Sequence, residues 1–359
     1  MSVLTAEEAL DLHRIRLAVE AVLEEFFAEQ IRSPVSPHIT DLVTTLRGLL
    51  FAGGKRIRPL MCICGWHAAH GKGDPAPVLR VAASLELFHA FALIHDDVMD
   101  GSETRRGRPS AHRALAVLHG DRAHRGNSRA FGANAGILLG DLALSWSDEM
   151  FQTAGLTAVQ SGAVLPVLHT MRTEVMLGQY LDLLFTGGLD GGLETALTTI
   201  RFKTAKYTFE RPLHLGAALA GSGAPVMDAC TAYALPLGEA FQLRDDLLGV
   251  FGDSATTGKP TIDDLREGKH TVLMSLAAVR ATPAQRGVLD AWVGSPALDE
   301  HRAAAVRGVL EDTRARRDVE AMIARRRGEA LRALDRAPFP PAVTATLRRL
   351  AHAMTERTS

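Results

Sequence analysis

Two short groups of aspartates are the residues of this 359-residue chain best suited to chemistry. The first group is Asp96-Asp97 with Asp100, and the second is Asp245-Asp246. Asp96 and Asp100 are four residues apart and share one face of a helix, where like charges repel by about 0.2–0.5 kcal/mol. Carboxylates at the C-terminal end of a helix also oppose its macrodipole. A divalent cation reverses both penalties, and oxygen ligands of this kind suit Mg²⁺, which completes its shell with substrate phosphates and water.

Basic residues accompany both aspartate groups. A single Asp pair is more often a solvated helix end, but two pairs, each after an apolar run and before cations, favour a site for metal and diphosphate. A P-loop is excluded because Arg56 stands where that motif requires Ser or Thr. The cations are Lys55, Arg56 and Arg58 beside Gly53-Gly54, and then Arg105, Arg106, Arg108, Lys203, Lys206, Lys259 and Lys269.

The elements that must position these groups are predicted to be helices. Ala and Leu dominate, aromatic residues make up 5%, and no alternating strand pattern stands out. Residues 102–132 are expected to be a loop with one short helix, and residues 251–268 a loop. We predict one all-α domain over residues 1–359, with the motifs in a core of about residues 40–280 and further helices over 280–359. Helical periodicity covers residues 5–31, 42–51, 78–100, 133–151, 164–185, 193–219, 232–250 and 271–279.

Composition excludes several classes of protein. The 40 basic and 41 acidic residues give a net charge of −1, which argues against a nucleic-acid partner bound through a basic field. The three cysteines give no disulfide framework, so we expect them to be reduced and buried. The first residues lack an export signal, and the longest uncharged run, residues 152–171, is too polar for a membrane span. We therefore expect a soluble, cytoplasmic protein.

These residues resemble the trans-isoprenyl diphosphate (polyprenyl) synthases over roughly residues 40–280. The resemblance implies an all-α bundle around a deep central apolar cavity, with the two aspartate groups facing each other across its mouth. It also implies a homodimer. The motifs that carry it are Gly53-Gly54-Lys55-Arg56-Ile57-Arg58-Pro59, Leu93-Ile94-His95-Asp96-Asp97-Val98-Met99-Asp100, Arg105-Arg106-Gly107, Gly140-Asp141, Gly178-Gln179, Lys203-Thr204, Phe241-Gln242-Leu243-Arg244-Asp245-Asp246 and Gly258-Lys259-Pro260.

The resemblance further implies roles for individual residues. The cofactor is Mg²⁺, three ions per site, and the substrates are isopentenyl diphosphate and an allylic diphosphate. One departure is Gly249, which stands where the family often has a third Asp after Asp245 and Asp246. The implied metal ligands are Asp96, Asp97, Asp100, Asp245 and Asp246. The implied ligands of isopentenyl diphosphate are Lys55, Arg58, His89 and Arg106, and those of the allylic diphosphate are Arg105, Lys203, Thr204, Gln242, Lys259 and Lys269. The residues expected to act in catalysis are Asp96, Asp97, Asp100, Arg105, Lys203, Asp245 and Lys259.

Product length is expected to depend on three residues about one turn or two before Asp96. In the resembled family a bulky residue at the position of Phe91 blocks elongation, and Phe91 with the small Ala92 resembles synthases that stop near geranylgeranyl diphosphate. Phe88 tightens the floor towards farnesyl diphosphate, and a buried Phe can also be ordinary core. A farnesyl or C25 diphosphate synthase stays open.

Three other classes of protein are alternatives to a prenyl synthase. A class I terpene cyclase would not need residues 53–59 or His89 for a second diphosphate. A non-catalytic subunit of a heteromeric synthase would show a degraded first aspartate group, which is intact here. A carboxylate-bridged di-iron bundle needs two Glu-x-x-His pairs on core helices, and only Glu86 with His89 qualifies.

Overall fold

The computed structural model describes residues 10–32, 37–122, 126–252 and 262–356, and these are almost entirely helical. The predicted all-α class is therefore confirmed. The chain divides into two compact units, each treated by itself below. Unit 1 is Met1–Ala163 with Gly216–Gly221, and unit 2 is Val164–Leu215 with Ser222–Ser359. The expected single domain over the whole chain stays a prediction.

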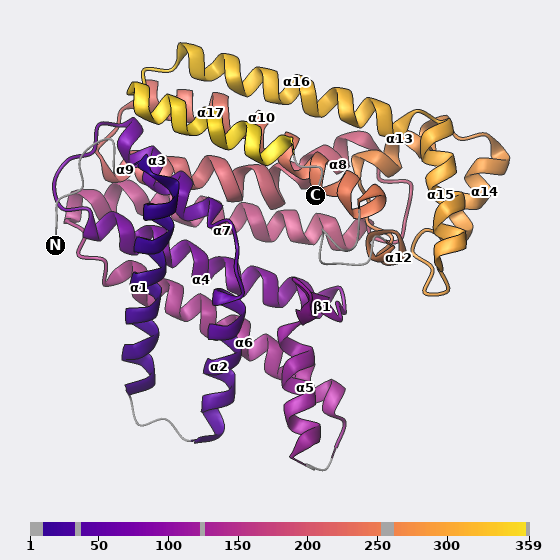
Figure 1. The fold of residues 1–359 in the computed structure, drawn as a ribbon, viewed down its shortest axis with the longest axis horizontal. Coiled ribbons are helices and arrows are strands. Elements are labelled where there is room, and N and C mark those ends of the chain that lie inside the picture. The colour runs from indigo at the N-terminus through magenta and orange to yellow at the C-terminus, as the bar shows by residue number, and fades with distance from the viewer. Residues whose placement is uncertain (1–9, 33–36, 123–125, 253–261, 357–359) are drawn as a thin grey trace. The chain divides into compact units, whose positions relative to one another are not determined.

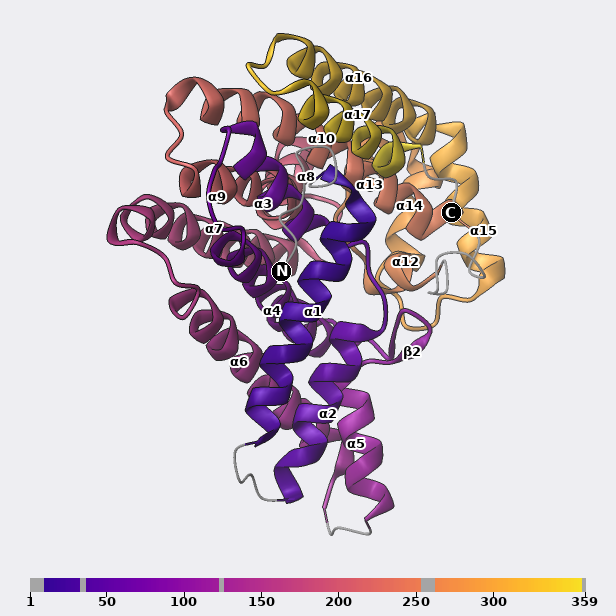
Figure 2. The same cartoon turned by 60° about the vertical axis from the view of Figure 1, so that its left-hand side comes forward.

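Unit 1 is built around the long helix α4, Ala76–Met99, against which α1, α2, α3, α5 and α6 pack. In Figures 1 and 2, α1 and α2 run alongside each other, and Arg47 of α2 pairs with Glu24 of α1. The other helices are α1 (Leu12–Arg32), α2 (Pro37–Phe51), α3 (Ile57–Ala68), α5 (Ala111–Asp121) and α6 (Ser128–Gln152). Two helices, α7 (Ala158–Phe185) and α9 (Arg211–Leu219), cross the boundary between the units in sequence.

A two-stranded hairpin follows α4 in the segment where a loop with one short helix was expected; α5 is that helix, and the hairpin was not predicted. Strands β1 (Thr104–Arg105) and β2 (Arg108–Pro109) pair antiparallel. The two residues between them, Arg106 and Gly107, have φ of 54° and 72°. Positive φ at both positions is the requirement of the tight turn that matches strand twist. The strands are two residues long, too short to show an alternating pattern in the sequence.

Unit 2 is centred on helix α10, Ala224–Phe251, which packs against α8, α12, α13, α16, α17 and a π-helix, η2. Helices α16 and α17 lie side by side in Figure 1. The predicted helix over 193–219 is confirmed in extent, but its middle, η2 (Arg201–Glu210), is wound as a π-helix between α8 and α9. The remaining helices are α8 (Gly192–Ile200), α12 (Asp263–Glu267), α13 (Val272–Arg280), α14 (Pro283–Trp292), α15 (Glu300–Asp312), α16 (Ala315–Arg336) and α17 (Pro341–Thr355).

Helix α4 is the one helix among the described residues that is long and apolar enough to cross a membrane, with a mean hydropathy of 1.5. Two thirds of that apolar segment is buried inside the protein, as expected for a core helix. All three cysteines are free and buried, as predicted.

Candidate active site

The first aspartate group lies at the C-terminal end of α4 and is held by Arg105 of the hairpin. The Arg105 Nε donates to both carboxylate oxygens of Asp97 at 2.8 Å, and its Nη2 reaches Asp97 Oδ1 at 2.6 Å. The same Nη2 lies 3.3 Å from Asp96 Oδ2. Asp97 is 1% exposed, so this charge-assisted pair compensates a buried carboxylate. Asp96 and Asp100 are half-buried and accessible.

Small residues on α6 fix the position of the α4 end. A Cβ on Gly140 would lie 2.2 Å from the His95 ring, and a Cβ on Gly136 would lie 2.8 Å from Val98 Cγ2. Both glycines therefore allow α6 to approach α4 closely at the turn that carries the aspartates. This close approach explains why Gly140, a residue of the Gly140-Asp141 motif, is needed there.

The predicted cations for isopentenyl diphosphate gather in unit 1 around His89. The Arg106 guanidinium donates to the carbonyl of Gly53, so the hairpin turn lies against the loop that carries Lys55 and Arg58. Burial, with the charges of Arg58 and Arg106, holds the pKa of His89 well below its usual 6.5. His89 is therefore neutral at pH 7, whereas Arg58 and Arg106 carry charge. The structure thus places Arg58 and Arg106 near His89, three of the four residues that the sequence assigned to isopentenyl diphosphate, and Lys55 lies on the same loop as Arg58.

A buried ion pair anchors the same loop. Arg56 has φ of 50° at the N-cap of α3, and it is 3% exposed. Its guanidinium bonds the Glu86 carboxylate at 2.9 Å, Glu20 at 3.2 Å and the Leu50 carbonyl at 2.7 Å. Sequence reasoning counted Arg56 only as one more cation, whereas the structure shows that it fixes the backbone between its two neighbours Lys55 and Arg58.

In unit 2, two glycines press neighbouring helices against the π-helix η2. A Cβ on Gly178 of α7 would lie 2.5 Å from the Lys203 backbone nitrogen, and one on Gly238 of α10 would lie 2.4 Å from the Ala205 Cα. Backbone therefore meets backbone on both sides of η2. This contact sets the positions of Lys203 and Thr204, and π-helical segments of this kind are frequent at functional sites.

Thr204, Gln242 and Asp246 form one hydrogen-bonded chain. The Thr204 hydroxyl donates to Gln242 Oε1 at 2.7 Å, and the Gln242 Nε2 donates to Asp246 Oδ1 at 2.8 Å. Burial raises the pKa of Asp246 to about 7 against this hydrogen bond, and the charges of Asp264 and Asp245 add to the rise. A carboxyl so surrounded gains from a cation that binds it.

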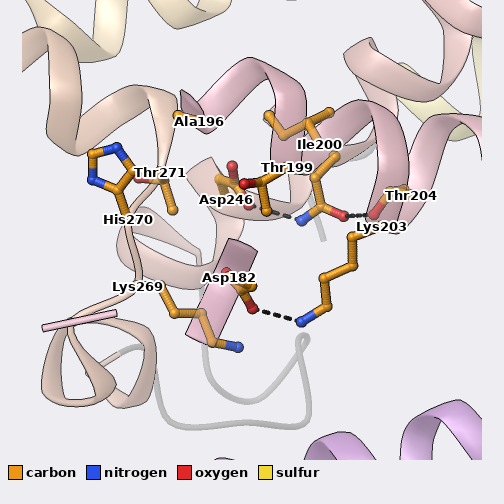
Figure 3. Close-up of a pocket in the computed structure, with 11 residues that line it drawn as sticks. Asp182, Ala196, Thr199, Ile200, Lys203, Thr204, Asp246, Lys269, His270 and Thr271 are labelled. Atoms are coloured by element: carbon orange, nitrogen blue, oxygen red, sulfur yellow. Dashed lines mark hydrogen bonds and ion pairs between the residues drawn. The ribbon is translucent and has the colours of Figure 1, made fainter. Parts of the chain in front are cut away.

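These residues line a pocket within unit 2 (Figure 3). The Lys203 Nζ is 2.6 Å from Asp182 Oδ2, and the Lys269 side chain extends towards the same space. Sequence reasoning missed Asp182; the available signal was its place on the helix of the Gly178-Gln179 motif, one turn after Gln179. It also missed five further residues of the lining, which are Ala196, Thr199, Ile200, His270 and Thr271. Lys259, also predicted for this site, lies outside the described residues.

The residues predicted to limit product length are buried in unit 1. Phe88 is fully buried and Phe91 is 9% exposed, with their ring centroids 5.3 Å apart. The Phe91 ring also lies edge-on to the ring of His95, with 4.8 Å between the centroids, and His95 immediately precedes Asp96. Ala92 beside it is half-buried. Their effect on product length stays a prediction.

Comparison with known proteins decides the family. Residues 40–310 match the family described as "Polyprenyl synthetase". This chain belongs to the polyprenyl synthetase family. Like its relatives it is a short-chain trans-prenyl diphosphate synthase, a trans-prenyltransferase.

Relatives of this polyprenyl synthetase have different product lengths. The chain is 33% identical, over 85% of its length, to a (2E,6E)-farnesyl diphosphate synthase of Mycobacterium tuberculosis, and the match covers 80% of that protein. It is 34% identical over 72% of its length to a geranylfarnesyl diphosphate synthase of Aeropyrum pernix, covering 76% of it. A solved structure of a geranylgeranyl pyrophosphate synthase from Corynebacterium glutamicum, complexed with isoprenyl diphosphate and magnesium, is 42% identical. That structure superimposes with a TM-score of 0.93, covering 97% of this chain and 99% of the other.

The donor chemistry of this polyprenyl synthetase fits Mg²⁺. Among the described residues, no three His, Cys, Asp or Glu side chains come together so that they could hold a metal ion by themselves. Mg²⁺ does not require such a cage, since it is bound through one or two carboxylates together with phosphate oxygens. Unit 1 offers hard oxygen donors at Asp96 and Asp100 beside Arg105, and unit 2 offers one at Asp246 in the pocket of Lys203 and Lys269. In each unit carboxylate oxygens lie near cations that suit a diphosphate, which is the combination that Mg²⁺ uses.

Proposed function

We propose that this chain condenses isopentenyl diphosphate with an allylic diphosphate, head to tail, and releases geranylgeranyl diphosphate and pyrophosphate. The observation that carries the proposed length is the buried Phe91 ring, which packs against His95, the residue before Asp96. Such a floor leaves limited depth for the growing chain. The geranylgeranyl synthase with a TM-score of 0.93 supports the same length. Farnesyl diphosphate is the competing product, because Phe88 lies next to Phe91 and farnesyl synthases are among the relatives.

In the proposed mechanism each diphosphate is held by its own group of residues. Lys55, Arg58, His89 and Arg106 bind isopentenyl diphosphate, with neutral His89 donating one hydrogen bond. Arg105, now on Asp97, turns part of its guanidinium to the allylic diphosphate. The acidic residues proposed as metal ligands are Asp96, Asp97, Asp100, Asp245 and Asp246. The cationic and polar residues proposed to hold the departing pyrophosphate are Lys203, Thr204, Gln242, Lys259 and Lys269.

The bonds change in a defined order. The allylic C–O bond breaks, and its electron pair leaves with pyrophosphate. Mg²⁺, which we expect as three bound ions, would stabilise the charge that develops on that leaving group. The isopentenyl double bond then forms a C–C bond with the allylic cation, and one proton passes to pyrophosphate. The chain's part is to orient both diphosphates and keep water from the cation.

The direct test incubates the chain with radiolabelled isopentenyl diphosphate, Mg²⁺, and dimethylallyl, geranyl or farnesyl diphosphate in turn. The expected product from each is geranylgeranyl diphosphate, identified by chromatography after dephosphorylation. A terpene cyclase would incorporate no isopentenyl label, and bound iron in a metal assay would instead indicate a di-iron bundle. A product that ends at farnesyl diphosphate would correct the proposed length while leaving the reaction class intact.

A variant separates the metal role of the first aspartate group from general effects. Asp96→Ala should reduce condensation by at least about a hundredfold because it removes a proposed metal ligand. Asp121→Ala, at the exposed end of α5, is the matched control and should keep normal turnover. Near-normal turnover of Asp96→Ala in Mg²⁺ would contradict the role.

We also place the enzyme in the cytoplasm and expect it to work as a homodimer. Light scattering on the purified chain measures the second expectation, since a dimer has twice the 38.6 kDa mass of the chain. A particle with the mass of one chain at micromolar concentration would contradict the dimer.

A further inference from the structure

The place where the second aspartate group lacks its third member is filled by a carboxylate from another helix. A Cβ on Gly249 would lie 1.8 Å from Asp264 Oδ2 and 2.9 Å from Asp264 Cγ. Gly249 is four residues after Asp245 on α10, so the two positions share one face of the helix. The Asp264 carboxylate therefore stands where the side chain of an Asp at 249 would begin.

Asp264 is held there by its helix, α12. Leu265 is 2% exposed and packs in the core of unit 2 with Leu247 and Val250 of α10. The helix ends at Gly268, whose φ is 72°, and the next backbone nitrogen, that of Lys269, donates to the Asp264 carbonyl at 3.2 Å. Packing and backbone hydrogen bonding thus fix the carboxylate against α10.

Negatively charged side chains of α10 and α12 are neighbours at this place. Asp264 lies against Gly249, which follows Asp245 and Asp246 by about one turn on α10, so this part of unit 2 carries three carboxylates. The Lys269 Nζ is 3.8 Å from Asp264 Oδ1 but 3.1 Å from Glu267 Oε2, so its nearer partner is Glu267. Gathering like charges in a half-buried place is costly unless a cation joins them.

We propose that Asp264 supplies the third carboxylate of the second aspartate group, in place of the residue missing at 249, and there serves Mg²⁺ and the diphosphate it binds. The inference rests on the proposed function for the identity of the metal. It assigns the role to a residue that the sequence motif does not contain. Gly249 is then a requirement of the site, because any side chain there displaces Asp264.

The test moves the carboxylate from position 264 on α12 to position 249 on α10. Asp264→Asn should weaken binding of Mg²⁺ in the presence of inorganic pyrophosphate by about tenfold or more, as loss of a supporting ligand does. Gly249→Asp should also weaken it, because the new side chain collides with Asp264. The double variant Gly249→Asp with Asp264→Gly restores a single carboxylate from α10 and should return to within about threefold of the unaltered protein. Isothermal titration calorimetry measures all three, with circular dichroism as the check on folding.

Asp263→Asn is the matched control, since Asp263 is on the same short helix but pairs with Arg266 at 3.0 Å. It should leave Mg²⁺ binding unchanged. The inference is overturned if Asp264→Asn binds Mg²⁺ as Asp263→Asn does, or if the double variant binds no better than Asp264→Asn. Condensation is assayed separately. If the unaltered chain makes prenyl product and Asp264→Asn binds Mg²⁺ normally, only this inference fails. If Asp264→Asn binds Mg²⁺ weakly but the unaltered chain makes no prenyl product, only the proposed function fails.

Discussion

The buried pair of Arg56 and Glu86 should be far more costly to break than an exposed pair in the same unit. The side chains of Arg56 and Glu86 are 2% and 5% exposed, and Arg56 Nη1 lies 2.9 Å from Glu86 Oε2. Arg56→Met leaves the Glu86 carboxylate in the core without its arginine. Breaking a buried pair from one side costs about 3–5 kcal/mol.

Replacing Glu86 instead of Arg56 should lower the free energy of unfolding by less, because Arg56 keeps two other partners. In Glu86→Gln the arginine keeps Glu20 at 3.2 Å and the Leu50 carbonyl at 2.7 Å. We therefore expect a loss of about 1–3 kcal/mol in the free energy of unfolding. The double variant Arg56→Met with Glu86→Leu leaves no buried charge, and it should be more stable than Arg56→Met alone.

Urea unfolding followed by tryptophan fluorescence can report on unit 1 by itself. Two of the three tryptophans, Trp66 and Trp146, are buried in unit 1, and Trp292 belongs to unit 2. All variants are therefore made in a Trp292→Phe background, so that the remaining signal comes from unit 1.

The control is the exposed pair of Arg47 and Glu24, which are 47% and 45% exposed at 2.8 Å. Arg47→Met should cost less than about 1 kcal/mol. If Arg56→Met is no more destabilising than Arg47→Met, or if the double variant is less stable than Arg56→Met, the buried pair does not act as described.

Three further changes have distinct readouts. Phe91→Ala should lengthen the prenyl products in chromatography because it opens the floor beneath the aspartates, and an unchanged product distribution would contradict the assignment. Because the pKa of Asp246 is raised to about 7, its proton must leave before a metal binds; Mg²⁺ affinity measured with pyrophosphate should fall by up to about tenfold per pH unit below pH 7, and a flat profile from pH 5.5 to 7 would speak against this. Gly216→Ala should cost about 3 kcal/mol or more in urea unfolding, since its Cβ would lie 1.8 Å from the Cys62 carbonyl oxygen. Gly287→Ala, with no atom within 4 Å, should instead stabilise α14 by about 1 kcal/mol, and equal effects of the two changes would refute the packing explanation.

Much of the fold follows from local signals. Apolar residues at helical spacing placed both ends of α4 and the C-terminal ends of α6, α7 and α10 closely, and Ala- and Leu-rich composition predicted the all-α class. The predicted start of α10 at residue 232 was wrong by about two turns, because the helix begins at Ala224. The hairpin at Thr104–Arg105 was not predictable in this way, because two residues per strand give no periodicity. Nor was the π-helix η2, which carries no local sequence signal and whose backbone is approached closely by Gly178 and Gly238 from other helices.

The candidate site was likewise predictable from the sequence only in part. The sequence by itself determined the two aspartate groups, the cations beside them and the family, because these are motifs of fixed spacing within single segments. Only the tertiary structure decided the partners: Asp182 for Lys203, Glu86 for Arg56, and Asp264 at the place left open by Gly249. Each of these pairs joins residues from different helices, 21 and 30 positions apart for the first two. Helix packing creates such contacts, and no local pattern of residue types records which helices will meet.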